Sequence, residues 1–596
     1  MRLRLRNRKR QRPGAAALGA ALFLAFALPG AALAQDVARP APERTTQIRG
    51  DARQPVRAKD WMVVAAHPLA AEAGAGVLRK GGSAIDAMVA VQLVLGLVEP
   101  QSSGLGGGAF LLYWDAGQKK LTSLDGRETA PSAATPELFL DDKGEPLKFF
   151  DAVIGGRSVG VPGTPRLLEA AHRRWGKLAW AELFEPAIRL AEEGFEPTPR
   201  LVTLAGEAAE SLSRQESAKT YFVDALGAAV SSGEPLKNLA YAETLKLLQA
   251  GGADAFYAGP VAESIVGAVT RFADNPGVMR LQDLAGYEVK EREPVCAAYR
   301  VFKVCGMGPP SSGGVSVGQI LGLLAPFDLA ELSPDMAATW RLIGDAMRLA
   351  FADRGRYLAD TDFVPAPIKG LLDPDYLAGR AKLLEGDGRL ENVEAGTPEW
   401  DHALNFAPDA AIEFPSTSHF VIVDRDGNIV SMTTTIENGF GSRLMVRGFL
   451  LNNELTDFSF ASHEDGVSVA NRVEPGKRPR SSMAPTIVLE DGAPVLAIGS
   501  PGGSRIIPYV AEALIAFLDW GMNVEEAVAL PHVANRFGTF DLEAGTRAED
   551  LAPGLAALGY EVKVTDLNSG LHAIAIGPDG LAGGADPRRE GVAIGE

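Results

Sequence analysis

Apolar residues along the chain recur at two spacings, one typical of helices and one typical of strands. Residues 61–98 contain a short aliphatic run and then two stretches of small apolar residues, which predicts a strand followed by two closely packed helices. Residues 160–290 have mainly helical spacing, and residues 336–360 predict one long amphipathic helix. Residues 370–415 are rich in Pro, Asp and Gly and only weakly patterned, so we expect a mobile connector there.

Beyond this connector the spacing changes to that of β-strands. Residues 417–424 and 429–437 consist of β-forming residues on either side of an Asp-Gly turn, which predicts a hairpin. Residues 449–458 and 485–499 predict further strands, and the last segments are typical of edge strands and turns. The whole pattern predicts stacked β-sheets covered by helices.

The first 34 residues differ from the rest of the chain. Seven basic residues within the first twelve precede an apolar stretch that ends in Ala-Leu-Ala at position 34. These features are typical of a cleavable secretory signal, so we expect the mature protein to begin near Gln35 and to be periplasmic or secreted. The alternative is a membrane anchor, which the glycines and proline inside the apolar stretch disfavour.

Removal of this leader changes the charge balance. The chain of 596 residues has a formal net charge of −17, and the loss of seven positive charges leaves −24. A surface this acidic repels nucleic acid and anionic membranes, which excludes nucleic-acid binding as a main function. The seven histidines are scattered without ligand spacing, so we expect neither a metal nor an organic cofactor.

The chain has two cysteines, Cys296 and Cys305, at the ends of a segment that predicts a hairpin with its turn near Arg300 and Val301. This register sets the two thiols opposite each other, and in an exported protein they can form a disulfide. Two small buried side chains are an equally good interpretation, so the pairing stays open. Cysteine catalysis has weak support, because no histidine or asparagine partner stands out.

Residues 500–507 form a glycine turn between an aliphatic strand and a long apolar helix that stops at Gly521. A strand, a glycine turn and a helix start together aim backbone N–H groups at one point, which favours binding of an anion. That anion can be a phosphate, a carboxylate or an oxyanion formed only during a reaction. A phosphate is disfavoured because no Gly-Lys-Ser/Thr sequence follows the turn.

Thr417 begins a predicted strand directly after the connector. If the chain is cut before Thr417, its α-amine, with a pKa of about 7.7–8.0, can take the proton of its own hydroxyl. His419 shares a face of the strand with Thr417 and is the rival base, and a solvated strand start without a catalytic role is the third interpretation. A two-residue Asp-Gly turn would set Thr417 opposite Ile436, with Thr435 diagonal to it.

Four motifs in the last third of the chain are TSHFVIVDRDGNIVSMTTTIENGFG, LLNNELTDF, KRPRSSMAPTIV and GSPGGSRII. Four earlier ones are SSGLGGGAF, DGRETAP, DAFYAG and PPSSGG. Together they resemble the gamma-glutamyltranspeptidases (gamma-glutamyltransferases), from about residue 60 to residue 590. The resemblance implies an α+β fold, the four-layer αββα sandwich of the N-terminal nucleophile hydrolases.

This resemblance also implies a precursor that cuts itself between Ser416 and Thr417. With a signal peptide over residues 1–34, the products would be a large subunit, 35–416, and a small catalytic subunit, 417–596, which remain together. Thr417 would act first in an N-to-O acyl shift and afterwards as the catalytic nucleophile.

The resemblance assigns the remaining catalytic roles to three residues. The hydroxyl of Thr435 would lie beside the nucleophile. Gly502 and Gly503 would form the oxyanion hole, whose donors stabilise the charge of the tetrahedral intermediate.

Five further residues match the family's contacts to the glutamyl head group. Arg127, Ser481 and Ser482 would bind its α-carboxylate, for which the planar fork of an arginine is suited. Glu454 and Asp457 would bind its α-ammonium group. Without the resemblance these five would be interpreted as a turn salt bridge, a polar strand start and solvated turn carboxylates.

Two features depart from many members of this family. Glu437 stands where many of them have Asn, which adds a negative charge to the ammonium site. The segment 458–476, which corresponds to a lid over the glutamyl pocket, is shorter than in lidded members, so a more open pocket is expected.

We therefore expect an exported enzyme that transfers the γ-glutamyl group of glutathione or a related donor to an amino acid, a peptide or water. One alternative is a glutaryl-cephalosporin acylase on the same scaffold, whose substrate lacks the α-amine. The other is an exported binding protein that keeps the fold without catalysis and without self-cleavage.

Overall fold

Two seven-stranded antiparallel sheets form the centre of the protein in the computed structural model, which describes residues 54–402, 404–409, 411 and 413–596. The first sheet contains, in spatial order, β21 (Val592–Gly595), β2 (Met62–Ala65), β8 (Ser418–Val423), β9 (Ile429–Thr435), β3 (Gly108–Asp115), β4 (Lys120–Gly126) and β5 (Lys290–Arg292). The second contains β1 (Val56–Ala58), β20 (Gly580–Ala585), β19 (His572–Gly577), β15 (Ala493–Gly499), β14 (Thr486–Glu490), β7 (Phe302–Gly306) and β6 (Val295–Tyr299). The expected signal peptide lies outside the described residues.

Apolar side chains fill the space between the two sheets. The first sheet contributes Val64, Leu112 and Val421, and the second contributes Ile487 and Ile574, among other residues of one buried cluster. Because side chains alternate along a strand, the other face of each sheet is left for helices to cover.

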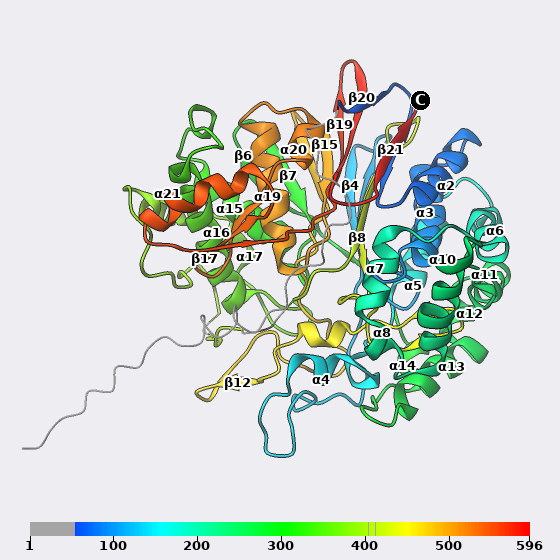
Figure 1. Ribbon diagram of the computed structural model, residues 1–596. Helices are drawn as coiled ribbons and strands as arrows, with labels where there is room; N and C mark the ends of the chain where they lie inside the picture. Colours follow the sequence, from blue (N-terminus) through cyan, green and yellow to red (C-terminus); the bar gives the residue numbers. More distant parts are fainter. Residues whose placement is uncertain (1–53, 403, 410, 412) are drawn as a thin grey trace, which may run out of the picture.

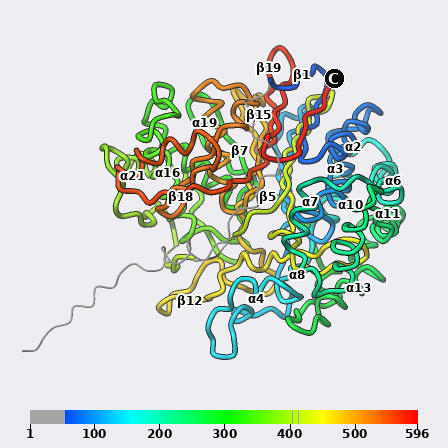
Figure 2. The backbone as a smooth tube through the Cα atoms, in the orientation of Figure 1, coloured from blue at the N-terminus to red at the C-terminus, as the bar shows by residue number. Residues whose placement is uncertain are grey.

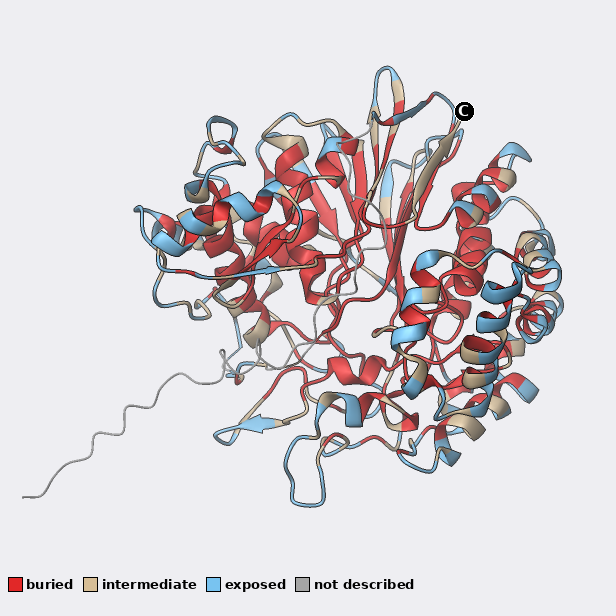
Figure 3. Ribbon diagram, viewed as in Figure 1, coloured by how far each residue is buried: buried red, intermediate tan, exposed pale blue. Residues whose placement is uncertain are grey.

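Helices cover both outer faces, so the molecule has four layers (Figure 1). The first sheet is covered by α2 (Pro68–Arg79), α3 (Ala84–Val98) and α5 (Thr164–Trp175), and the second by α15 (Gly313–Leu324), α16 (Ala337–Tyr357) and α19 (Ile506–Leu518). Every residue of α3 is buried, and the exposed residues gather on the outermost helices (Figure 3). The predicted αββα sandwich is confirmed.

The remaining helices and strands extend these layers. The predicted helical region contains α6 (Glu185–Glu193), α7 (Pro199–Glu207), α10 (Leu226–Ser232), α11 (Leu239–Gly251), α12 (Asp254–Tyr257), α13 (Gly259–Arg271) and α14 (Leu281–Ala285). A small sheet of β16 (Val533–Asn535), β17 (Thr539–Glu543) and β18 (Glu561–Thr565) lies beside α21 (Ala552–Ala557), and α20 (Val524–Val528) packs against β19 and β20. None of the helices in the described part of the chain has the length and apolar character that a membrane crossing needs.

Strands from the two ends of the described chain lie side by side (Figure 2). β1 pairs with β20, and β2 pairs with β21. Both sheets therefore need residues from before and after position 417.

The cysteine hairpin is confirmed and the open question of its pairing is resolved. Cys296 lies opposite Cys305 in the β6–β7 pair, and the two form a disulfide. Tyr299 pairs with Phe302, so the turn falls at Arg300 and Val301 as predicted.

Two segment predictions were wrong. The connector is not featureless: it begins with α17 (Ile368–Leu371) and α18 (Pro374–Ala381), and residues 413–416 at its end are buried. The strand predicted over 449–458 is only β11 (Phe449–Leu450), followed by the 3-10 helix η6 (Glu454–Asp457). One turn of a 3-10 helix separates Glu454 from Asp457, so their side chains project in the same direction.

Candidate active site

Thr417 directly precedes β8, at the end of the pair that β8 forms with β9. Its Oγ1 donates a hydrogen bond to Thr435 Oγ1 at 3.1 Å, and Thr435 Oγ1 also accepts from the backbone N–H of Glu437 at 2.9 Å. Both threonines are buried. The hydroxyl of Thr417 is therefore oriented by Thr435, whose own hydroxyl is fixed by the backbone N–H of Glu437.

The observed register differs by one residue from the predicted one. Ser418 pairs with Thr434 and Val423 with Ile429, which leaves a longer turn with Gly427 at φ +80°. A turn that ends in a left-handed glycine shifts the partner strand by one position relative to a two-residue turn. As a result Thr435 continues the register directly opposite Thr417, whereas the two-residue turn set it diagonally.

The backbone at Thr417 is strained. Its φ of +126° lies in a region that side chains with a branched Cβ rarely adopt. Such strain costs about 1–3 kcal/mol and is held by the surrounding structure. Hydrogen bonds hold both residues of the peptide bond before Thr417. Ser416 Oγ donates to Gln101 O at 3.0 Å, and Thr417 O accepts from Arg589 Nη1 at 2.9 Å.

Arg127 joins the two acidic residues of η6. Its Nη1 bonds Glu454, and its Nη2 bonds Asp457 Oδ2 at 2.5 Å. Burial alone would lower the pKa of Arg127, but the two carboxylates outweigh it and raise that pKa. Burial raises the pKa of Asp457 well above its ordinary value, against the opposing effect of Arg127. One oxygen of each acid, Glu454 Oε2 and Asp457 Oδ1, is buried without a hydrogen-bond partner among the described residues.

Glu437 extends this acidic surface toward the threonines. Its Oε1 accepts from Phe414 N at 3.1 Å, and its other oxygen accepts from Asn453 Nδ2. Burial, and then the nearby carboxylate of Glu454, raises the pKa of Glu437 to about 8. A carboxyl group in this state accepts a cation readily, because a positive charge would offset the cost of its ionisation.

Ser481 and Ser482 form the opposite wall. Ser481 Oγ accepts from Met483 N at 3.1 Å. Ser482 Oγ donates to Glu413 and accepts from Arg354 Nη2 at 2.8 Å. The carboxyl group on this wall is therefore supplied by the segment that precedes Thr417.

The glycine turn faces the same space. Gly503 lines the pocket and is the first residue of a single 3-10 turn, η7 (Gly503–Arg505), which leads directly into α19. Gly502 and Gly503 have φ values of +139° and +57°, which favour glycine. A Cβ on Gly503 would lie 2.4 Å from Phe414 O, so the turn and the connector are in close contact.

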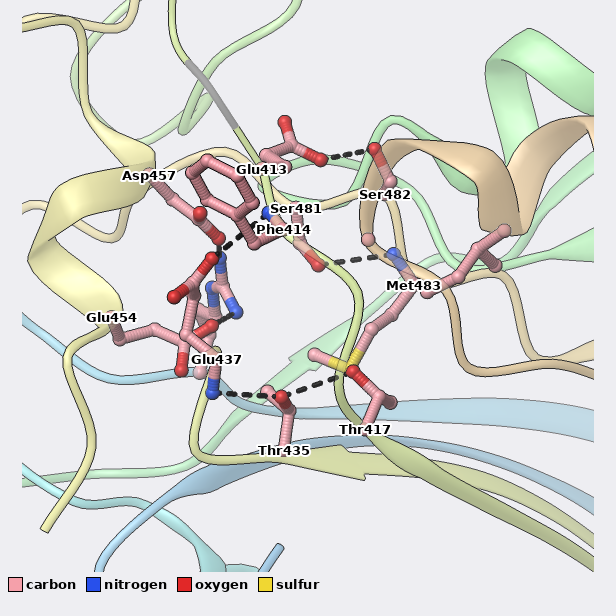
Figure 4. A pocket seen from close by; sticks show the side chains of 13 residues that line it. Glu413, Phe414, Thr417, Thr435, Glu437, Glu454, Asp457, Ser481, Ser482 and Met483 are labelled. Carbon is pink, nitrogen blue, oxygen red and sulfur yellow. Dashed lines mark hydrogen bonds and ion pairs between the residues drawn. The ribbon is translucent and has the colours of Figure 1, made fainter. Parts of the chain in front are cut away.

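These elements enclose one small pocket (Figure 4). Its lining contains nine of the residues predicted for the site, namely Arg127, Thr417, Thr435, Glu437, Glu454, Asp457, Ser481, Ser482 and Gly503. Glu413 and Phe414 also line it. The space inside is about 20 Å³, enough for about one water molecule.

His419, the rival base, does not line this pocket. Its Nδ1 lies 2.9 Å from Thr433 Oγ1, and burial lowers its pKa well below the ordinary value. Within the described residues, no cluster of His, Cys, Asp or Glu has the arrangement of a metal site.

Comparison with known proteins agrees with this geometry. The model of the gamma-glutamyltranspeptidase family matches residues 70–596. This chain belongs to that family. The glutathione hydrolase proenzyme of Bacillus subtilis is 39% identical over 550 residues, covering 90% of this chain and 92% of that protein. The Escherichia coli glutathione hydrolase proenzyme is 34% identical, with 95% and 97% covered.

A solved relative has a similar fold with a different printed activity. The cephalosporin acylase from Bacillus halodurans superposes with a TM-score of 0.79 at 27% identity, covering 92% of this chain and 98% of that one. Two acyl groups therefore have to be compared as substrates for this pocket, the γ-glutamyl group and the glutaryl group.

Gly502 is the one predicted site residue outside the pocket lining of this transpeptidase-family chain, although it adjoins Gly503. Sequence reasoning missed Glu413, Phe414 and Arg354. The first two fell in the segment expected to be a mobile connector, and their only signal was nearness to Thr417. Arg354 carried no signal, because its partners come from distant parts of the chain.

Proposed function

We propose that this chain is the precursor of an exported gamma-glutamyltransferase and glutathione hydrolase. The observation that supports this proposal most directly is the hydrogen bond between Thr417 Oγ1 and Thr435 Oγ1. It lies in a pocket whose lining also contains Arg127 and four acidic side chains, three of them, Glu437, Glu454 and Asp457, from residues after Thr417. Family membership supports the enzyme class, and the acidic side chains support a donor with an α-ammonium group.

Maturation would cut the peptide bond between Ser416 and Thr417. Thr417 Oγ attacks the carbonyl carbon of Ser416, the acyl group moves from nitrogen to oxygen, and water hydrolyses the resulting ester. The strained φ of Thr417 supports this site, because cutting the bond removes the constraint on φ. The products would be a large subunit ending at Ser416 and a small subunit beginning at Thr417.

In the mature enzyme the freed α-amine of Thr417 would take the proton from its Oγ as that oxygen attacks the γ-carbonyl carbon of the donor. Backbone N–H groups of Gly502 and Gly503 would stabilise the oxyanion, each by about 2.7–4 kcal/mol. The leaving amine departs with the proton. An amino acid, a peptide or water then attacks the γ-glutamyl ester and restores the hydroxyl.

A glutaryl-cephalosporin acylase is the second candidate, because a cephalosporin acylase is among the similar solved structures. Its glutaryl group lacks an amine, so it would bring no further positive charge to Glu437, Glu454 and Asp457, of which the last two already bond the guanidinium group of Arg127. These acids are buried, and a positive charge in the pocket would relieve their mutual repulsion. The pocket chemistry therefore favours the γ-glutamyl group.

Export is proposed from the sequence alone. The basic and apolar leader over residues 1–34 supports a periplasmic or secreted location, with small-molecule donors and acceptors as partners.

One experiment tests the proposal at both levels. The purified protein is run on a denaturing gel, the smaller band is sequenced from its N-terminus, and γ-glutamyl and glutaryl p-nitroanilides are compared as donors. We expect two bands, Thr-Ser-His-Phe at the start of the smaller one, and faster turnover of the γ-glutamyl donor. A single full-length active band would exclude the mechanism, and preference for the glutaryl donor would favour the acylase.

A further inference from the structure

The carboxyl group of Glu413 occupies one end of the pocket in the uncut chain. It accepts hydrogen bonds from Ser482 Oγ and from Arg354, whose Nη2 also donates to Ser482 Oγ at 2.8 Å. The side chains of Arg354 and Glu413 are only 5% and 4% exposed. Burial alone would raise the pKa of Glu413, but the guanidinium groups of Arg354 and Arg480 lower it, so the carboxylate is ionised.

Arg127 has little capacity left for a substrate carboxylate. Its Nη1 and Nη2 bond Glu454 and Asp457. Its Nε donates to Pro479 O at 3.2 Å, and Nη2 also donates to Arg480 O at 3.0 Å. A guanidinium group has five N–H donors, so most of them are in use. A carboxylate entering this pocket needs a further cation.

A glutamyl group can enter only after the segment 413–416 withdraws, because the space beside it is about 20 Å³. Self-cleavage makes this withdrawal feasible, since Glu413 then lies near a free chain end. Arg354 stays behind on α16, where Ser312 Oγ accepts from its Nε at 2.8 Å. A buried guanidinium group that loses its carboxylate is unfavourable until another anion replaces it.

The vacated pocket has the charge pattern of an amino-acid head group. Ser482 lies at the end that Glu413 leaves, and Glu437, Glu454 and Asp457 lie at the other (Figure 4). Arg354 belongs to the first end, because it bonds both Glu413 and Ser482. A carboxylate at the first end and an ammonium group at the second would match both.

Resting on the proposed function, we propose that Arg354 binds the α-carboxylate of the donor in the mature enzyme, at the position that Glu413 holds in the uncut chain. Glu413 is therefore an internal stand-in for the substrate carboxylate, and cleavage frees the binding site as well as the amine of Thr417.

Three p-nitroanilide donors test this assignment on the processed enzyme. The γ-glutamyl donor has both charged groups, the glutaryl donor has only the carboxylate, and the 4-aminobutyryl donor has only the amine. Arg354→Gln should raise KM for the first two by roughly tenfold to a hundredfold, because a charge-assisted hydrogen bond is lost. It should leave KM for the 4-aminobutyryl donor unchanged within about twofold.

Arg348→Gln is the matched control. Arg348 is a buried arginine on the same helix that bonds Asp345 Oδ1 at 2.7 Å and does not line the pocket. It should leave the ratio of the three KM values unaltered. If Arg354→Gln is not processed, the double variant Arg354→Gln/Glu413→Gln keeps the buried cluster neutral and should give the same selective loss.

Uniform changes across all three donors, or no change in any, would overturn the assignment. A different result would show that the proposed function is wrong and the role of Arg354 is right. The wild-type enzyme would then prefer the glutaryl donor, and Arg354→Gln would still raise KM for that donor. Wild-type protein inactive on all three donors would overturn both.

Discussion

One hydroxyl, that of Thr435, connects the nucleophile to the pocket wall. Thr435→Val keeps the shape of this side chain and removes the hydroxyl. We expect self-cleavage and turnover of γ-glutamyl-p-nitroanilide to slow by about tenfold to a hundredfold, because Thr417 Oγ1 loses its buried acceptor. The conversion rate of precursor and kcat of processed enzyme measure the effect.

Thr434→Val is the control for this change. Thr434 Oγ1 is buried one residue earlier on β9 and has no hydrogen-bond partner among the described residues. It should retain normal rates. Equal slowing in both variants would mean that the strand, not the hydroxyl of Thr435, was disturbed.

Glu437 should make the uncut protein less stable as pH rises. Its pKa is about 8 in the folded protein, raised by burial and then by Glu454 from an ordinary value of 4.5. The folded state therefore binds the proton more tightly than the unfolded chain does. Stability from this group is complete below about pH 4.5, declines as pH rises, and is lost once pH passes about 8.

Melting temperatures at pH 5 and pH 9 measure this effect in the uncut Thr417→Ala protein. Adding Glu437→Gln should reduce the drop between the two pH values by a few degrees. If the Gln side chain weakens the contact with Asn453, the resulting loss of stability does not depend on pH and lowers the melting temperatures at pH 5 and pH 9 by the same amount. Parallel pH curves for the two proteins would count against a raised pKa.

At the scale of elements, the sequence predicted most strands and helices, since each rests on local spacing. The wrong predictions concern segments whose structure is determined by a turn or by a contact with a residue far away in the sequence. The Asp-Gly pair near Gly427 was compatible with two turn lengths, and the longer one moved the register by one residue. Residues 449–458 contain β-forming side chains, yet η6 forms there because Glu454 and Asp457 both bond Arg127.

The same reason explains which site residues could be predicted. Thr417, Thr435 and the glycine turn lie in short motifs with local signals. Arg354 meets Glu413 across 59 positions of sequence, and no local pattern indicates that contact.

The glycine turn provides a prediction at this scale. Gly503→Ala should block self-cleavage, because its new Cβ would lie 2.4 Å from Phe414 O and displace the segment before the scissile bond. Gly492→Ala is the matched control: Gly492 also has a positive φ, +79°, but a Cβ there meets nothing within 4 Å. The control should lose about 1–2 kcal/mol of stability by urea unfolding and still be processed. If both variants are cut at the normal rate, the turn does not hold the scissile segment.

At the scale of the whole molecule, the position of the proposed cut determines how the two pieces remain associated. In the first sheet, β2 from the large piece lies between β21 and β8 from the small piece. In the second, β1 and β7 from the large piece flank the four central strands β20, β19, β15 and β14 of the small one. Neither piece contains all the strands of either seven-stranded sheet, so backbone hydrogen bonds and the core between these two sheets hold the pieces together.

We therefore expect the processed pieces to elute together from a sizing column in native buffer, at the volume of the uncut Thr417→Ala protein. They should separate only in denaturant and unfold in a single transition, because exposing one piece would leave long strand edges and an apolar sheet face unpaired. The measurement is sizing chromatography across a urea series, with both pieces followed on denaturing gels. A small piece that elutes alone in native buffer and still cleaves γ-glutamyl-p-nitroanilide would show that the large piece contributes no essential strand, which the interleaved order of β2, β8 and β21 does not allow.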